Sequence, residues 1–179
     1  MKKTTPAPTG RRLFSTLYEM SAALFVAVLV SKLVVPIAYH AIQDHQLRNR
    51  AMQIYAALST ARVEAIQRNA SITVCATSDA SVAVPRCSDS ADDWSKGWVV
   101  YVANGKQAGI EVIKRGTQSA PWMVTSAPIG SAHLTFLPDG TLGTPRRTAI
   151  TLASLDSTGP AREISVSRLG HANISVRGP

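Results

Sequence analysis

The sequence contains little charge, few aromatic residues and only two cysteines. Charged residues make up 17% of the 179 residues and hydrophobic residues 45%, which is too apolar a composition for a disordered chain. Two cysteines exclude both a disulfide-dense mini-protein and a four-cysteine zinc site. The length predicts one ordinary domain with an additional segment.

Sequence motifs of catalysis are also absent. There is no HExxH motif, no GxSxG nucleophile motif and no P-loop, and the four histidines form no metal-ligand pattern. The adjacent acids Asp92 and Asp93 are expected to be solvated loop residues. The sequence therefore indicates neither an enzyme nor a bound cofactor or metal.

The net charge of +8 is concentrated at the N-terminus. Residues 1–14 hold four basic residues and no acid, whereas residues 71–179 hold ten basic and eight acidic residues. A basic N-terminal segment in front of a domain with nearly balanced charge indicates membrane targeting more than binding to nucleic acid.

A long apolar segment follows the basic start. The stretch 13–39 is long enough to span a hydrocarbon core of about 30 Å, with Lys32 toward its far end, where the side chain could snorkel to the interface. Glu19 lies at the beginning of the apolar helix. Its carboxylate could sit in the headgroup region near the positive end of the helix dipole, or it could meet a cation on another chain.

Three kinds of N-terminal signal fit parts of this pattern. A secretory signal peptide would be cut near Ala41, although Tyr39-His40-Ala41 matches the small-x-small rule poorly. A twin-arginine signal is suggested by Arg11-Arg12 with the Phe14 that follows. A prepilin-type signal would combine a basic leader with a glutamate just inside the apolar helix and a proline deeper within it.

A second helical pattern follows directly. Residues 43–69 contain no glycine or proline, and apolar residues recur at spacings of four and three, which predicts one buried stripe. Asn69 is the expected end of the helix. The predicted stripe consists of Leu47, Ala51, Ile54, Leu58, Ala61 and Ala65, whereas Arg48, Arg50, Gln53, Arg62, Glu64 and Arg68 are expected off it. Joined to the apolar segment, this makes one Pro36-kinked helix of roughly fifty residues.

The rest of the chain predicts β structure. β-Branched and alternating segments are separated by turn signals, among them Asn104-Gly105 and Pro138-Asp139-Gly140, which favours an antiparallel β sandwich or a curved sheet. Trp94 and Trp98 are expected in core packing. The expected strands are 71–77, 98–103, 110–115, 122–125, 133–137, 148–155, 163–168 and 173–177.

The two cysteines are placed to pair with each other. Cys75 lies in the first expected strand and Cys87 just after it, and the membrane segment in front indicates an oxidising periplasm. The sequence therefore predicts a Cys75–Cys87 disulfide, with two separate buried thiols as the alternative. The CxxC spacing of a redox-active pair is absent.

Four ordered blocks of the sequence resemble the GspH/FimT-type minor pseudopilins of type II secretion systems and type IV pili. The first block is the helix end Leu58–Asn69 (LxxARxEAIxRN). The second consists of Cys75, Cys87, Asp93-Trp94 and Gly97-Trp98-Val-Val-Tyr101. The third is Leu134–Gly140, and the terminal block is Glu163–Gly170. The resemblance covers almost the whole chain.

The resemblance implies an α+β, pilin-like fold. A long N-terminal helix, half transmembrane and half amphipathic, would pack on a small antiparallel β sandwich. The implied segments are a basic leader at 1–14, a transmembrane and assembly helix at 15–41, an amphipathic helix at 42–70 and a periplasmic β domain at 71–179. The implied location is the inner membrane, with a single pass, or the tip of a filament.

The resemblance also implies how such a chain acts. A prepilin peptidase removes the leader, here between Phe14 and Ser15, and the helix enters a filament with other major and minor pilins. Glu19 would pair with the amino terminus of a neighbouring subunit, and Pro36, seventeen residues on, lies in the same helix. The chain departs from the family at the cleavage site, since Phe14 replaces the usual glycine and Ser15 the usual phenylalanine.

Binding of DNA during uptake is an alternative function. Some family members carry a basic Gly-Arg-x-Arg motif at the position where this chain reads Gly170-His171-Ala172-Asn173. The basic residues that remain nearby are Arg168 and Arg177, and Lys114-Arg115 and Arg146-Arg147 are further basic pairs. Because both motif arginines are absent, we do not expect nucleic acid as a partner. Export of a periplasmic β-domain protein by the twin-arginine route is the third alternative.

Overall fold

The computed structural model of the protein describes residues 10–102, 111–117, 123–127, 132–144, 148–155 and 161–178. The chain forms two compact units, Met1–Ile42 and Gln43–Pro179, and each is considered by itself. Four features considered above lie outside the described residues: the Asn104-Gly105 turn, Trp122, the Arg146-Arg147 pair and residues 1–9 of the basic leader.

One helix, α1 (Gly10–Arg68, 59 residues), contributes to both units. It begins a few residues before the apolar segment because Arg11, Arg12 and the residues after them include no helix breaker. The helix continues through Pro36. The predicted helix is therefore present, and it is longer than the sequence pattern suggested.

The helix ends as its sequence predicts. Asn69 has a φ of 48°, the left-handed conformation that asparagine tolerates well. The amide of Ala70 then donates a hydrogen bond to the carbonyl of Ala65 at 3.2 Å, which satisfies one of the last carbonyls of the helix.

In the described residues eight strands follow the helix, and each lies within two residues of an expected strand. They are β1 (Ile72–Ala76), β2 (Trp98–Val102), β3 (Glu111–Gly116), β4 (Met123–Ser126), β5 (His133–Phe136), β6 (Thr148–Ser154), β7 (Ala161–Val166) and β8 (Ala172–Arg177). Sheet A has the strand order β3-β2-β1-β5 and sheet B the order β4-β6-β7-β8, with every pairing antiparallel.

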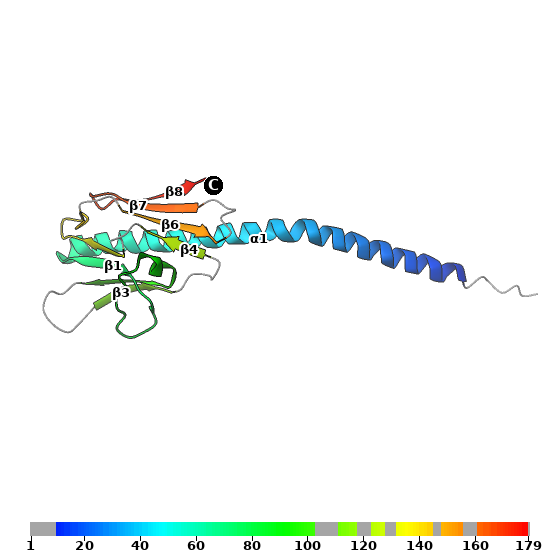
Figure 1. The fold of residues 1–179 in the computed structure, drawn as a ribbon, viewed down its shortest axis with the longest axis horizontal. Helices are drawn as coiled ribbons and strands as arrows, with labels where there is room; N and C mark the ends of the chain where they lie inside the picture. Colours follow the sequence, from blue (N-terminus) through cyan, green and yellow to red (C-terminus); the bar gives the residue numbers. More distant parts are fainter. Residues whose placement is uncertain are drawn as a thin grey trace, which may run out of the picture. The chain divides into compact units, whose positions relative to one another are not determined.

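The core of the second unit lies where α1 meets the two sheets. Figure 1 shows the cyan part of α1 between the sheet labelled β1 and β3 and the sheet labelled β6 and β7. Val74 and Phe136 of sheet A and Ile150 and Ile164 of sheet B are fully buried in one cluster with the helix. The predicted α+β fold is confirmed.

The predicted stripe of α1 is buried in full, but the buried surface is wider than the stripe. Ala57 is also fully buried, and Arg50, which was expected off the stripe, is only 6% exposed. The expectation for Arg50 was wrong because a helix covered by two sheets buries more than one face. The stripe residues that the structure buries are Leu47, Ala51, Ile54, Leu58, Ala61 and Ala65.

A short 3-10 helix, η1 (Ala91–Ser95), was not expected from the sequence. The Ser90 side chain accepts a hydrogen bond from the Asp92 amide at its start. Within this turn Asp93 is only 8% exposed, so the expectation of a solvated acid pair was wrong for Asp93. Trp94, beside it, is fully buried, as predicted.

Candidate assembly helix and domain surfaces

The first unit consists of apolar helix that nothing in the described part of the chain covers. The large apolar side chains that the structure describes there are at least 47% exposed, and α1 is long and apolar enough, by length and composition, to cross a membrane. The exposed set includes Tyr18, Met20, Leu24, Phe25, Val26, Val28, Leu29, Val30, Val34, Ile37 and Tyr39. So much exposed apolar surface on one element requires lipid or protein around it.

Polar side chains within this apolar surface are satisfied locally where the helix allows it. The Ser21 hydroxyl donates to the Tyr18 carbonyl at 2.8 Å, and the Ser31 hydroxyl donates to the Ala27 carbonyl at 2.7 Å. Glu19 and Lys32 are exposed and form no ion pair within the described residues. Thirteen residues of helix separate them by about 20 Å, too far for them to neutralise each other.

The other residues with an expected role in assembly also lie in α1. Phe14 and Ser15, the expected cleavage site, both have helical backbone, as does Pro36. Glu19 and Pro36 are separated by about 26 Å of helix axis. The structure thus places these sequence-predicted residues on one element.

In the second unit Arg62 joins three of the sequence blocks identified above. Its Nε donates to the Gly140 carbonyl at 3.1 Å, and its Nη1 lies 3.2 Å from Nδ1 of His171, which accepts. Gly140 follows β5 of sheet A, whereas Gly170 and His171 lie between β7 and β8 of sheet B. We call Arg62, Gly140, Gly170 and His171 the Arg62 cluster. It fastens the helix to a turn from each sheet.

The end of α1 is also tied to sheet A by charge. Arg68 donates to Glu64 at 2.5 Å and to Glu111 of β3 at 2.6 Å. The Glu64–Arg68 pair has the i,i+4 spacing of neighbours on one helix face, whereas the Glu111 contact depends on the tertiary fold. These two hydrogen bonds raise the pKa of Arg68, which therefore stays charged.

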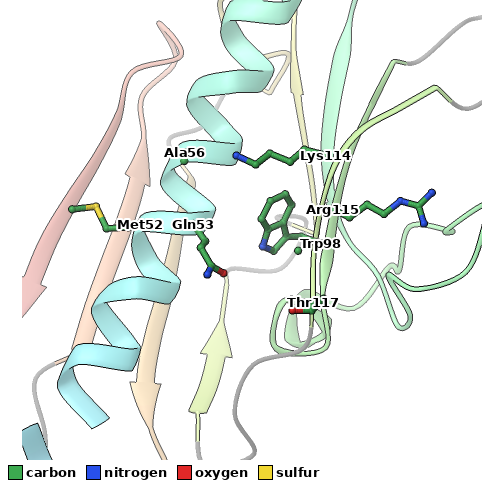
Figure 2. Close-up of a pocket in the computed structure, with 8 residues that line it drawn as sticks. Met52, Gln53, Ala56, Trp98, Lys114, Arg115 and Thr117 are labelled. Carbon is green, nitrogen blue, oxygen red and sulfur yellow. The ribbon is translucent and has the colours of Figure 1, made fainter. Parts of the chain in front are cut away.

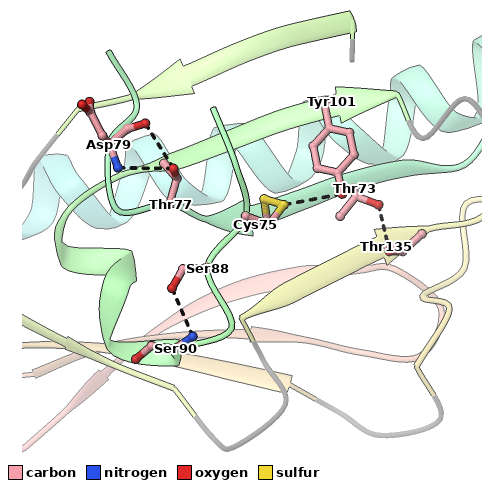
Figure 3. The surroundings of a disulfide bond; sticks show 9 residues. Thr73, Cys75, Thr77, Asp79, Ser88, Ser90, Tyr101 and Thr135 are labelled. Carbon is pink, nitrogen blue, oxygen red and sulfur yellow. Dashed lines mark hydrogen bonds between the residues drawn. A yellow bond between two sulfur atoms is a disulfide. The ribbon is translucent and has the colours of Figure 1, made fainter. Parts of the chain in front are cut away.

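Cys75 and Cys87 form the predicted disulfide, with a Cα–Cα distance of 5.6 Å. Figure 3 shows the bond beside Tyr101, whose hydroxyl donates to Sγ of Cys87 at 3.5 Å. Arg115 of β3 holds the loop between the two cysteines, since its guanidinium donates to the carbonyls of Val82 at 2.7 Å and Ala83 at 3.0 Å. The loop is therefore fixed both covalently and by hydrogen bonds.

Asp93 is held by two partners on its own loop. Its Oδ1 accepts from Nζ of Lys96 at 2.8 Å, and its Oδ2 accepts from the Ser88 hydroxyl. These two contacts hold the pKa of Asp93 below its ordinary value of 3.8. In Asp79 and Asp139, hydrogen bonds from Ser81 and Thr141 lower the pKa in the same way.

Substituting Asp93 by asparagine is expected to cost about 1–2 kcal/mol of unfolding free energy at neutral pH. Because folding lowers the pKa of Asp93, its contribution is complete above pH 3.8 and is lost as the pH falls through its folded value. Urea unfolding of the wild type and Asp93→Asn from pH 3 to 7 measures this. A stability difference between the two proteins that does not change with pH would contradict the assignment.

The basic residues near the C-terminus do not form one surface. Arg168 precedes β8 and Arg177 ends it, so they lie at opposite ends of the strand. Arg177 pairs with Glu163 at 3.4 Å. In the basic pair on β3, Arg115 is bound to the cysteine loop, whereas Lys114 forms no ion pair with any described residue. These four basic residues of the described chain therefore do not form one continuous basic patch of the kind that nucleic acid requires.

Known proteins resemble this chain in sequence family and in fold. The model of the family GspH, described as a type II transport protein, matches residues 50–170. The chain is similar in structure to the type IV minor pilin FimU of Pseudomonas aeruginosa strain PAO1, at 24% identity and a TM-score of 0.57, over 76% of this chain and 91% of FimU.

A second solved structure is similar over nearly its whole length. The minor pseudopilin EpsH from the type 2 secretion system of Vibrio cholerae is 10% identical, with a TM-score of 0.54, over 75% of this chain and 99% of EpsH. No curated protein sequence matches the chain. At these identities the two likenesses establish the fold.

Proposed function

The chain belongs to the GspH family of type II transport proteins, and from this we propose that it is a minor pilin or pseudopilin of a type II secretion system or a type IV pilus. The observation that supports this most directly is the exposed apolar half of α1 with Glu19 near its start. Such a helix suits both storage in a membrane and packing among other helices.

In this proposal the chain is anchored in the inner membrane by a single pass, with its β domain in the periplasm. Removal of the leader between Phe14 and Ser15 by a prepilin peptidase would leave Glu19 as the fifth residue of the mature chain. The protein would then join other pilins in a filament, where it primes assembly or lies at the tip.

Assembly into the filament would depend on the side-chain carboxylate of Glu19. In an apolar environment an unpaired carboxylate is costly, and the amino terminus of a neighbouring subunit would neutralise it. The helix dipole also stabilises the charged carboxylate, because the N-terminal end of a helix favours negative charge. Pro36, deeper in the helix, would take part in helix packing.

Replacement of Glu19 by alanine is expected to reduce co-assembly with partner pilins about tenfold or more, because the neighbouring amino terminus loses its counter-ion. The measurement is recovery of the protein with sheared filaments, compared with its amount in the membrane. A second measurement, the intact mass of the recovered protein, shows whether residues 1–14 have been removed.

Glu64→Ala is the matched control, since it removes a carboxylate from the same helix outside the apolar segment and should leave assembly unchanged. Unaltered recovery of Glu19→Ala would overturn the role of Glu19. A recovered mass that begins after Ala41 would indicate conventional export and contradict the proposal.

A further inference from the structure

A groove of about 450 Å³ lies between α1 and the strands β2 and β3. Its walls include Gln53 and Ala56 on α1, Trp98 on β2, and Lys114 and Gly116 on β3. Figure 2 shows Lys114 and Gln53 on either side of the Trp98 ring, whereas Arg115 points away. The groove belongs entirely to the second unit.

Antiparallel pairing explains why these side chains meet. Trp98 pairs with Gly116 and Val100 with Lys114, and side chains two residues apart point to the same face of a strand. Lys114 therefore shares the helix-facing side of sheet A with Trp98. A Cβ at Gly116 would lie 2.2 Å from Nε1 of Trp98, so only glycine leaves room for the indole.

The polar groups around the groove are mainly hydrogen-bond donors without acceptors. Nε1 of Trp98 is buried and has no hydrogen-bond partner among the described residues, although Trp98 is only 2% exposed. No carboxylate belongs to the groove's described lining, and Lys114 has no ion-pair partner within the described part of the chain. A buried N–H without an acceptor costs about 1–3 kcal/mol of desolvation, so an acceptor supplied from outside would be favourable.

A buried positive charge contacts one of the residues that line the groove, Gln53. Arg50 is 6% exposed, and its Nη1 donates to Oε1 of Gln53 at 3.3 Å, whereas its Nε and Nη2 are buried without a hydrogen-bond partner among the described residues. This bond uses the oxygen of the Gln53 amide, and the amide nitrogen is a separate group that can donate to a ligand. Burial lowers the pKa of Arg50, but an arginine stays charged, and its charge favours an anion nearby.

We propose that the α1–β3 groove binds an acidic side chain from an extended segment of a partner protein. The carboxylate would accept from Lys114, from the amide nitrogen of Gln53 and from the Trp98 indole after a small adjustment of the ring. The segment would lie along β3, an edge strand of sheet A whose outer backbone groups can pair with another strand. This site is separate from the apolar helix on which the proposed assembly depends.

An alternative role for Lys114 needs no ligand. A lysine on the inner face of an edge strand discourages unwanted pairing with other sheets. That role predicts no saturable binding at the groove. A direct binding measurement therefore distinguishes the two roles.

The test is a titration of the full chain in non-ionic detergent, followed by the ¹H–¹⁵N signal of the Trp98 indole, with Trp94 and Trp122 as internal references. The probe is a tripeptide, acetyl-Val-Glu-Val-amide, and its comparison is acetyl-Val-Gln-Val-amide. We expect a saturable downfield shift of the Trp98 signal with the glutamate peptide. The glutamine peptide and sodium acetate should bind at least about fivefold more weakly.

Two variants locate the binding. Lys114→Gln is expected to weaken binding of the glutamate peptide about fivefold, and Lys114→Arg should restore most of it. Arg86→Gln, which removes an exposed cation elsewhere, should leave it unchanged. Absence of a shift, equal binding of the glutamine peptide or of acetate, or stronger binding of inorganic phosphate at equal ionic strength would each overturn the proposal.

Discussion

Replacing Gly170 by alanine is expected to lower the free energy of unfolding by about 3 kcal/mol or more. Gly170 has a φ of 75°, and an added Cβ would lie 2.1 Å from the carbonyl oxygen of Gly140. Both the left-handed backbone and the backbone clash oppose a side chain there. The carbonyl cannot retreat freely because it accepts the hydrogen bond from Arg62. Urea unfolding of the full chain in non-ionic detergent, followed by tryptophan fluorescence, measures the loss.

The other glycines provide graded controls for this experiment. Gly178→Ala should be neutral, since nothing lies within 4 Å of its added Cβ. Gly140→Ala should have an intermediate effect, because its φ is 77° but the nearest atom, 2.7 Å away, is the flexible end of Ile66. Adding Ile66→Ala should recover part of the loss in Gly140→Ala and none of the loss in Gly170→Ala. Equal effects at Gly170 and Gly178 would contradict the close approach of the two turns.

The regular elements could be predicted because their signals are local. The apolar spacing of residues 43–69 predicted most of the buried face of α1, and β-branched segments between turn residues located the eight strands of the described residues. In the first strand, alternating residue types predict one buried and one exposed face, but all five residues of β1 are buried. Val74 packs in the core on one face of β1, and on the other face Cys75 is buried where it is bonded to Cys87.

The contacts that hold the candidate surfaces together could not be predicted in the same way. Asp93 and Arg50 looked like solvent-exposed polar residues, and only the tertiary structure buries them. Arg62 belongs to a recognisable sequence block, but its partners Gly140 and His171 are 78 and 109 residues away. The one local signal was the recurrence of glycine in the later blocks, and glycine at a positive φ often marks a close backbone approach.

Removal of the Cys75–Cys87 disulfide is expected to cost about 3 kcal/mol of unfolding free energy. The two cysteines are 12 residues apart, and closing a loop of that length removes about this much chain entropy from the unfolded state. The comparison is the wild type with and without dithiothreitol against Cys75→Ala/Cys87→Ala. Reduction should lower the stability of the wild type to near that of the double variant, and it should leave the double variant unchanged.

The disulfide and Arg115 are expected to act together, because both close the same loop. With the disulfide intact, the carbonyls of Val82 and Ala83 are already near Arg115, so Arg115→Ala should cost about 1 kcal/mol. Without the disulfide, the hydrogen bonds of Arg115 must order the loop themselves and therefore contribute less. A double-mutant cycle should thus give a coupling of about 0.5 kcal/mol or more between the two. Strict additivity would mean that Arg115 and the disulfide stabilise the loop independently.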